Sequence, residues 1–213
     1  REQNEVRNGI PPTSLKNNRL VKPFEFLVKM YGIPGYGEVD PTSFVAISYM
    51  VMFGVMFGDV GQGFVLLCVG LYLSLAKKQY DFGGILSRVG LSSMIFGLLY
   101  GSIFGNEEII RPLLIHPLEN INIMLLGGVI LGVVLSTISY IYNFINSGKS
   151  RDIEEGIFGR EGLAGFIFYW ICLLCALSIY RYGRLSVPIP IVQGILVLLL
   201  AAMIIKQPLV RFI

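Results

Sequence analysis

The sequence predicts an all-α protein, a polytopic bundle of membrane-spanning helices. Hydrophobic residues make up 54% of the 213 residues and charged residues only 15%, whereas soluble domains average about 45–50% and about 25%. The mean hydropathy is +0.68, and the apolar residues gather in long runs between short charged segments. The net charge of only +3 excludes the dense basic surface of a nucleic-acid-binding protein.

The N-terminal residues 1–41 are polar and basic, and their prolines interrupt any long helix. We expect this segment to be a cytoplasmic linker with a short amphipathic helix at Phe24–Met30, followed by a transmembrane domain over residues 42–213. The chain begins with an arginine and ends directly after an apolar run. We therefore expect it to be a fragment of a longer protein.

Six apolar segments follow residue 41. A transmembrane helix needs about 20 apolar residues, and the run from Thr42 to Ala76, in which Asp59 is the only charged residue, is too long for one straight span. Gly58 and Gly61 permit a turn beside Asp59, so the run divides into two short helices. The six predicted spans are about 42–57, 62–76, 85–105, 121–145, 163–180 and 187–205.

The basic residues are distributed unevenly between the two sides of this bundle. With six spans, both ends of the chain lie on one side, which carries 14 of the 17 Lys and Arg residues. The other side carries Arg111, Arg181 and Arg184. The positive-inside rule therefore predicts a multi-pass protein of the lipid bilayer with both ends in the cytoplasm.

Glycines at four-residue spacing occur at Gly54 and Gly58 and again at Gly97, Gly101 and Gly105. Such spacing places small residues on one helix face and lets two backbones approach closely. Helix packing is the structural interpretation of these glycines. A pore-lining or sliding surface is the alternative.

Two charged residues lie within the apolar runs. A charge at membrane depth costs about 2.5–3.5 kcal/mol on insertion scales, so Asp59 is a candidate for an ion path. Its alternative is structural: it could cap the following helix by accepting backbone N–H bonds. Arg88 lies about one turn inside the third span, where we expect it to snorkel to the cytoplasmic interface as a structural charge.

The residue types that carry catalysis are scarce. His116 is the only histidine, so a Ser-His-Asp set is not expected and His116 lacks a second His or Cys nearby for a metal site. Cys172 and Cys175 lie mid-span without a second cysteine pair, which is typical of small buried apolar residues. We expect no catalytic site within this chain, no metal and no cofactor.

Three ordered segments carry a family resemblance. They read PFEFLVKMYGIPGYGEVDPT over residues 23–42, FGVMFGDVGQG over residues 53–63 and FGLLYGSIFGNE over residues 96–107. In this order they closely resemble the membrane half of the large stator subunit of rotary V-type ATPases. That subunit is called subunit a in eukaryotes and subunit I in archaea and bacteria.

The resemblance implies partners and a function. In that family a cytoplasmic N-terminal domain joins the peripheral stalks, and eight membrane helices face a ring of proteolipid c subunits. Two aqueous half-channels carry protons or sodium ions, and an arginine on the seventh helix separates them. On this mapping the seventh and eighth helices lie beyond Ile213 and the stalk-binding domain precedes Arg1. The chain itself supports ion translocation without hydrolysing ATP.

The resemblance also implies roles for two acidic residues. Asp59 matches the acidic residue of the second motif and Glu107 the acidic residue after the third. Both are expected to line or shape the non-cytoplasmic half-channel, where negative charge concentrates cations. We expect Asp59→Asn to lower ion pumping more than assembly.

Two other functions remain open at this point. A small secondary transporter or channel would need its own midplane site, often with inverted repeats, and no such repeat is visible between residues 42–105 and 121–205. A purely structural scaffold is favoured if the Asp59 side chain is shielded from water and forms hydrogen bonds only with backbone groups. The compact spacing of the motifs favours a bacterial or archaeal protein of the cell membrane.

Overall fold

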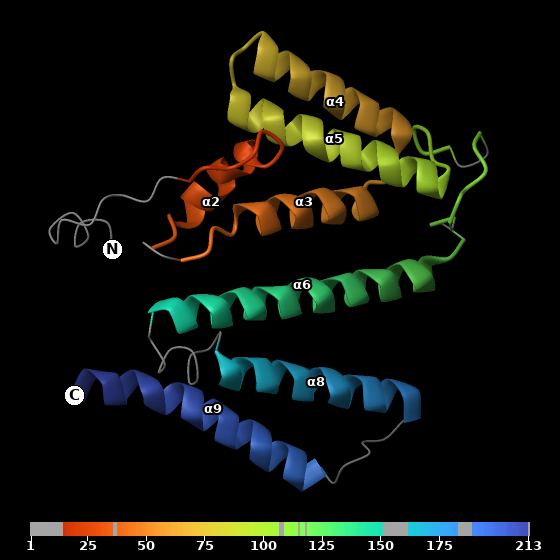
Figure 1. The fold of residues 1–213 in the computed structure, drawn as a ribbon. Coiled ribbons are helices and arrows are strands. Elements are labelled where there is room, and N and C mark those ends of the chain that lie inside the picture. Colours follow the sequence, from red (N-terminus) through yellow and green to blue (C-terminus); the bar gives the residue numbers. More distant parts are fainter. Residues whose placement is uncertain are drawn as a thin grey trace, which may run out of the picture. The chain divides into compact units, whose positions relative to one another are not determined.

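The computed structural model describes residues 15–35, 38–106, 109–114, 116–117, 119–150, 162–182 and 189–212 (Figure 1). Within these residues all regular elements are helices, so the all-α class is confirmed. The chain divides into two compact units. The first comprises Arg1–Tyr36 and Asp40–Val133, and the second comprises Gly37–Val39 and Val134–Ile213.

Each predicted span overlaps one helix, although the bounds differ. The elements are η1 (Lys22–Phe24), α2 (Glu25–Tyr31), α3 (Thr42–Met56), α4 (Val60–Leu75), α5 (Tyr80–Tyr100), α6 (Ile121–Ser150), α8 (Leu163–Tyr182) and α9 (Ile189–Phe212). The bounds of α5, which was predicted at 85–105, differ at both ends. The helix ends at Tyr100 because Gly101 adopts a left-handed conformation with φ +73° and its N–H binds the Gly97 carbonyl.

Three helices of the described residues are long and apolar enough to cross a membrane, namely α5, α6 over Ile121–Lys149 and α8. The other apolar helices are shorter: α3, α4 and Pro190–Ala201 within α9. The 16 residues of α4 extend over about 24 Å, whereas the hydrocarbon core of a bilayer is about 30 Å thick. Length and composition therefore support three of the six predicted spans and not the other three.

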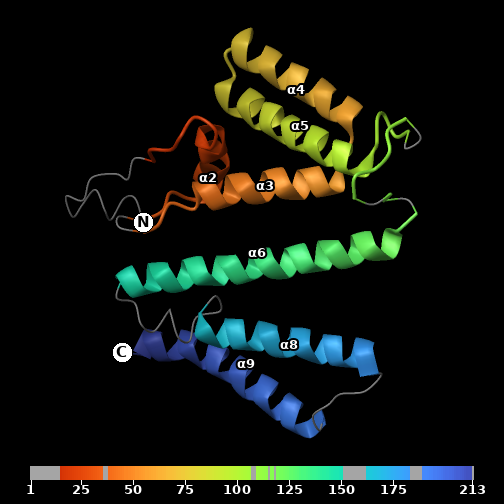
Figure 2. The ribbon, with the colours of Figure 1, turned by 45° about the vertical axis from the view of Figure 1, so that its right-hand side comes forward.

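Helix α5 lies between α3 and α4 in the first unit, as both ribbon views show (Figures 1 and 2). Its contact with α4 is made by backbone. A Cβ added at Gly70 would lie 2.4 Å from the Ser87 nitrogen, and one added at Gly90 would lie 2.6 Å from the Leu67 nitrogen. The glycines of this contact recur every seven residues: Gly63 and Gly70 on α4, and Gly83, Gly90 and Gly97 on α5.

Helix α5 contacts α3 through hydroxyl groups as well as through packed rings. Ser92 donates a hydrogen bond to the Met50 carbonyl at 2.5 Å, and Ser93 donates to the carbonyl of Phe57. Tyr100 donates to the Val55 carbonyl at 3.3 Å. These polar side chains of α5 thus have acceptors on α3 or directly after it.

In the second unit, aromatic side chains of α6 pack against those of α8. Tyr140 and Phe144 of α6 contact Phe166 of α8, with ring centroids 5.4 and 5.8 Å apart. Tyr169 also lies against Tyr140, at 6.0 Å, and α8 packs against α9. Edge-to-face ring pairs of this kind stabilise a contact by about 0.5–1.5 kcal/mol beyond the area they bury.

Candidate functional site

The Asp59 carboxylate lies in the turn between α3 and α4 and accepts hydrogen bonds at both oxygens. Its Oδ1 accepts from the Gln62 N–H at 2.8 Å and from the Phe104 N–H at 2.9 Å. Its Oδ2 accepts from the Gly105 N–H at 2.7 Å and from the Ser102 hydroxyl at 2.9 Å. The carboxylate therefore ties the start of α4 to the segment that follows α5.

The same four donors set the charge state of Asp59, whose exposed fraction is only 6%. Burial by itself raises the pKa of this carboxyl, but the hydrogen bonds from Gln62, Gly105, Phe104 and Ser102 outweigh it, and the net pKa is lowered from 3.8. Hydrogen bonds to the charged form stabilise it. Asp59 is therefore an ionised carboxylate whose charge is satisfied by protein donors.

The surrounding backbone is built closely around this carboxylate. The Val60 N–H binds the Ser102 carbonyl at 3.0 Å, and a Cβ at Gly97 would lie only 2.4 Å from the Val60 nitrogen. Phe104 and Gly105 both have positive φ, +47° and +77°. This backbone conformation turns two successive N–H groups toward one side chain, forming a concave anion site that Asp59 occupies.

Asp59 is the N-cap of α4, as the capping interpretation predicts. Three of its four donors are backbone groups and the fourth is a serine. Its predicted place in an ion path is not tested by this geometry and stays a prediction. Glu107, the second predicted ion-path residue, lies outside the described residues.

The predicted packing glycines have different surroundings. Cβ atoms at Gly54, Gly58 and Gly97 would meet the Phe96 ring, the Tyr100 ring and the Val60 nitrogen, each within 2.4 Å. A Cβ at Gly101 would lie 2.5 Å from the Ile110 carbonyl, in the loop after α5 rather than in another helix. A Cβ at Gly105 would meet nothing within 4 Å.

The Arg88 guanidinium attaches the N-terminal segment to α5. Its Nε donates to the Leu20 carbonyl and its Nη2 to the Arg19 carbonyl, both at 2.6 Å. Its Nη1 donates to the Gly84 carbonyl at 2.8 Å. Sequence reasoning assigned Arg88 a structural role at the interface, and the structure gives its acceptors. Two of them, the Leu20 and Arg19 carbonyls, lie 68 and 69 residues away in sequence.

We expect Arg88→Lys to release the N-terminal segment from α5, because one ammonium cannot reach three carbonyls that a planar guanidinium spans. Each lost hydrogen bond from a charged donor weakens the contact by about 1.5–3 kcal/mol. Amide hydrogen exchange at Val21 and Phe24 should therefore accelerate about tenfold or more. Arg111→Lys, in the exposed loop after α5, is the matched control and should leave both rates unchanged.

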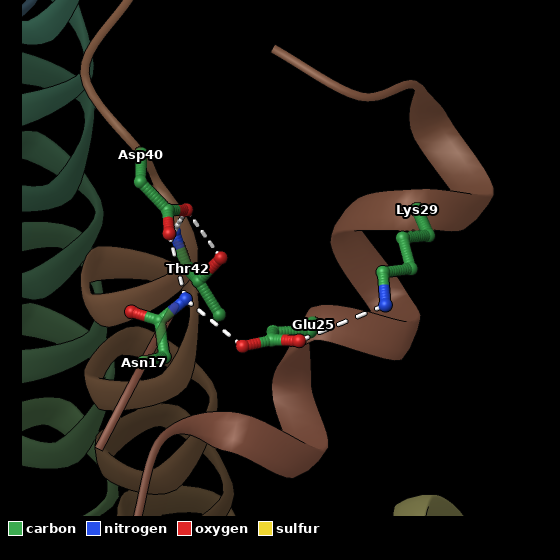
Figure 3. Close-up of polar contacts among 5 residues, drawn as sticks. All are labelled: Asn17, Glu25, Lys29, Asp40 and Thr42. Carbon is green, nitrogen blue, oxygen red and sulfur yellow. Dashed lines mark hydrogen bonds and ion pairs between the residues drawn. The ribbon is translucent and has the colours of Figure 1, made fainter. Parts of the chain in front are cut away.

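A second polar cluster joins α2 to the start of α3 (Figure 3). Asn17 donates from its amide to Asp40 Oδ2 at 2.6 Å and to Glu25 Oε1 at 3.2 Å. Asp40 accepts from the backbone N–H of Thr42 at 2.9 Å and from its hydroxyl, and Glu25 pairs with Lys29 at 3.6 Å. The cluster explains why the first motif carries an acidic residue near each of its ends.

Sequence reasoning missed this cluster and the part of Ser102 in the Asp59 site. The signal for Asp40 was present, since an Asp followed by Pro-Thr directly before an apolar run is a helix-start pattern. Asn17 lies in a polar segment with no periodicity, and nothing in its sequence surroundings predicts that it bridges two carboxylates.

In the described residues no group of three or more His, Cys, Asp or Glu side chains is arranged to hold a metal ion. Cys68 and Cys172 are exposed and Cys175 is half-buried, all three as free thiols.

Fold and site together define a helical protein with helices long and apolar enough to cross a membrane, in which a buried carboxylate ties the start of α4 to the segment after α5. The family model of the V-type ATPase 116kDa subunit family matches residues 2–106, which include both helices of the Asp59 turn and the segment after α5. The chain belongs to this family.

Relatives with established names agree. The chain is 30% identical over 201 residues to V-type ATP synthase subunit I 2 of Treponema pallidum, covering 80% of this chain and 44% of the relative. It is 31% identical over 194 residues to A-type ATP synthase subunit I of Pyrococcus horikoshii, covering 86% and 28%. It is 34% identical over 114 residues to V-type proton ATPase 116 kDa subunit a 1 of Caenorhabditis elegans, covering 47% and 13%. The chain therefore spans less than half the length of each of these relatives.

Proposed function

We propose that this chain is the membrane part of a rotary ATPase stator subunit that supports proton or sodium translocation beside a proteolipid c ring. The observation that carries the proposal is the family match over residues 2–106, a range that includes α3, α4 and α5. The names of the relatives, an ATP synthase subunit I and a proton ATPase subunit a, support it. The peripheral stalk would attach through the N-terminal domain of the whole protein.

The proposed topology has six spans with both ends in the cytoplasm of a bacterial or archaeal cell. The positive-inside distribution of Lys and Arg supports this topology. The short helices α3 and α4 would cross as a hairpin. Local thinning of the bilayer or burial against other subunits accommodates such short spans. The Asp59 turn then lies on the non-cytoplasmic side and Lys77-Lys78 on the cytoplasmic side.

The proposed ion path reaches the non-cytoplasmic side near the segment that follows α5. In this path Asp59 does not bind the ion, because its carboxylate is occupied by the N–H groups of Phe104 and Gly105 and by other donors. It shapes the path instead. Glu107 comes two residues after Gly105 and supplies the negative charge that attracts cations. Asp59 thus acts by holding the segment that carries Glu107.

The test is to isolate the parent protein from its own membranes through an affinity tag. We expect a proteolipid and the nucleotide-hydrolysing subunits of a rotary ATPase to copurify, and proteoliposomes of this complex to take up protons or sodium ions when ATP is added. A protein that purifies alone and still moves an ion or solute would instead be a secondary transporter or channel. A complex that assembles equally well without the protein would also contradict the proposal.

A further inference from the structure

A cavity of about 810 Å³ lies where the N-terminal segment meets the turn between α4 and α5. This volume is within the range of about 300–1,000 Å³ that is typical of ligand sites. Four basic side chains line it, against one acidic side chain, Asp81. The basic residues are Arg19, Lys22, Lys78 and Arg88.

The positive charge of this cavity is not neutralised within the described part of the chain. The ion pair found in the described residues joins Lys29 to Glu25, and neither residue lines the cavity. Arg88 uses its donors on carbonyl groups and on the Ser87 hydroxyl, which hold its position without cancelling its charge. Several like charges around one concave wall create a potential that favours an anion.

The start of α5 contributes to the same wall. Its first-turn residues Tyr80, Asp81 and Phe82 line the cavity, as does Gln79, which precedes them. The Gln79 side chain forms no capping hydrogen bond. The N–H groups of an uncapped first turn and the positive end of the helix dipole both favour a bound anion.

Part of the remaining wall is apolar and lies at the end of a helix that is long enough to span a membrane. Phe26, Leu71 and Phe82 line the cavity and are 43%, 46% and 57% exposed. Leu75, near the end of α4, is 76% exposed. A small free anion needs no such wall, whereas a phospholipid brings a phosphate and acyl chains together.

We propose that this cavity binds the phosphate of an anionic glycerophospholipid, whose acyl chains lie along Leu71 and Phe82. The inference requires α5 to span a membrane and does not depend on the rotary function. Under the topology proposed above, the lipid comes from the cytoplasmic leaflet, where basic pockets between membrane helices bind anionic headgroups.

The experiment is native mass spectrometry of the purified full chain in detergent, titrated with phosphatidylglycerol or with phosphatidylcholine. We expect one phosphatidylglycerol to bind in preference to phosphatidylcholine. The double variant Lys22→Gln/Lys78→Gln should weaken phosphatidylglycerol binding roughly tenfold or more, since each lysine near the headgroup contributes to anionic lipid attraction. Both lysines are exposed, and Gln keeps the aliphatic part of each side chain, so the fold should persist.

Lys77→Gln is the matched control. Lys77 is an exposed neighbour of Lys78 that does not line the cavity, so its loss should leave binding unchanged. An equal weakening by Lys77→Gln would show general attraction by surface charge and would overturn the site. Equal binding of the two lipids to the unaltered chain would overturn it as well.

Two further arms identify the occupant. Inorganic phosphate is added as a competitor, and we expect it not to displace the lipid at millimolar concentration; displacement there would assign the cavity to free phosphate. A photoreactive residue replacing Phe82 is activated in native membranes, and we expect it to become linked to a phospholipid. Linkage to a protein segment instead would assign the cavity to a protein partner and overturn the proposal.

Discussion

Gly70→Ala is expected to push α4 away from α5 and to destabilise the first unit by about 1–3 kcal/mol or more, as overpacking does. The added Cβ would lie 2.4 Å from the Ser87 nitrogen and 2.7 Å from the Gly83 carbonyl oxygen. These are backbone atoms of a neighbouring helix, which cannot move aside as a side chain tip can. The measurement is unfolding of the purified chain in mixed detergent micelles.

The matched control is the same substitution in α6, at Gly132, where an added Cβ meets nothing within 4 Å. Alanine exceeds glycine in helix propensity by about 0.8–1.0 kcal/mol, so Gly132→Ala should leave stability unchanged or raise it. The two substitutions are therefore expected to have opposite signs. A loss of stability at Gly132 equal to that at Gly70 would show that the glycines matter for a reason other than the backbone contact.

The contact between α4 and α5 also shows where sequence reasoning was incomplete. Four-residue spacing drew attention to Gly54, Gly58 and the series from Gly97, whereas the backbone contact follows a seven-residue spacing that includes Gly70 and Gly90. That spacing is visible in the sequence, since glycines seven residues apart return to nearly the same face of a helix. Which of the two glycine patterns contacts a neighbouring helix depends on how the helices pair. A single sequence without relatives does not reveal this pairing.

The division of the run from Thr42 to Ala76 was predictable, because the glycines around Asp59 mark a turn and the run exceeds one span. The turn lies where expected, with α3 ending at Met56 and α4 beginning at Val60. The donors of the Asp59 site were not predictable in the same way. Phe104 and Gly105 are more than 40 residues away in sequence. They are the two central residues of a local turn closed by backbone hydrogen bonds between Ile103 and Asn106, and both have positive φ.

Asp59→Asn is expected to destabilise the chain by about 3 kcal/mol and to reduce assembly and ion transport together. An amide has one oxygen, whereas the carboxylate offers acceptors to Gln62 and Phe104 on one side and to Ser102 and Gly105 on the other. Either orientation of the amide points its NH2 group at backbone N–H donors. The expectation from sequence is different, since there pumping falls more than assembly; the measurement of uptake per assembled complex decides between the two.

Ser102→Ala provides the graded comparison, because it removes one donor and leaves the three backbone donors in place. Its effect on stability should be about 1 kcal/mol, as for a single hydrogen bond. Unfolding of the purified chains gives both stabilities, and the yield of assembled complex follows them. Stabilities that do not follow this order would show that the four hydrogen bonds do not hold the turn.

The decisive measurement is ion uptake per assembled complex in proteoliposomes, compared across three carboxylate variants. Complexes with Asp59→Asn that do assemble should retain most of their uptake, because Asp59 positions the segment without binding the ion. Glu107→Gln should lower uptake with assembly intact, since it removes charge from the proposed path. Glu119→Gln, an exposed acidic residue farther along the same loop, should change neither quantity. Normal assembly with abolished uptake in Asp59→Asn would instead make Asp59 an ion ligand.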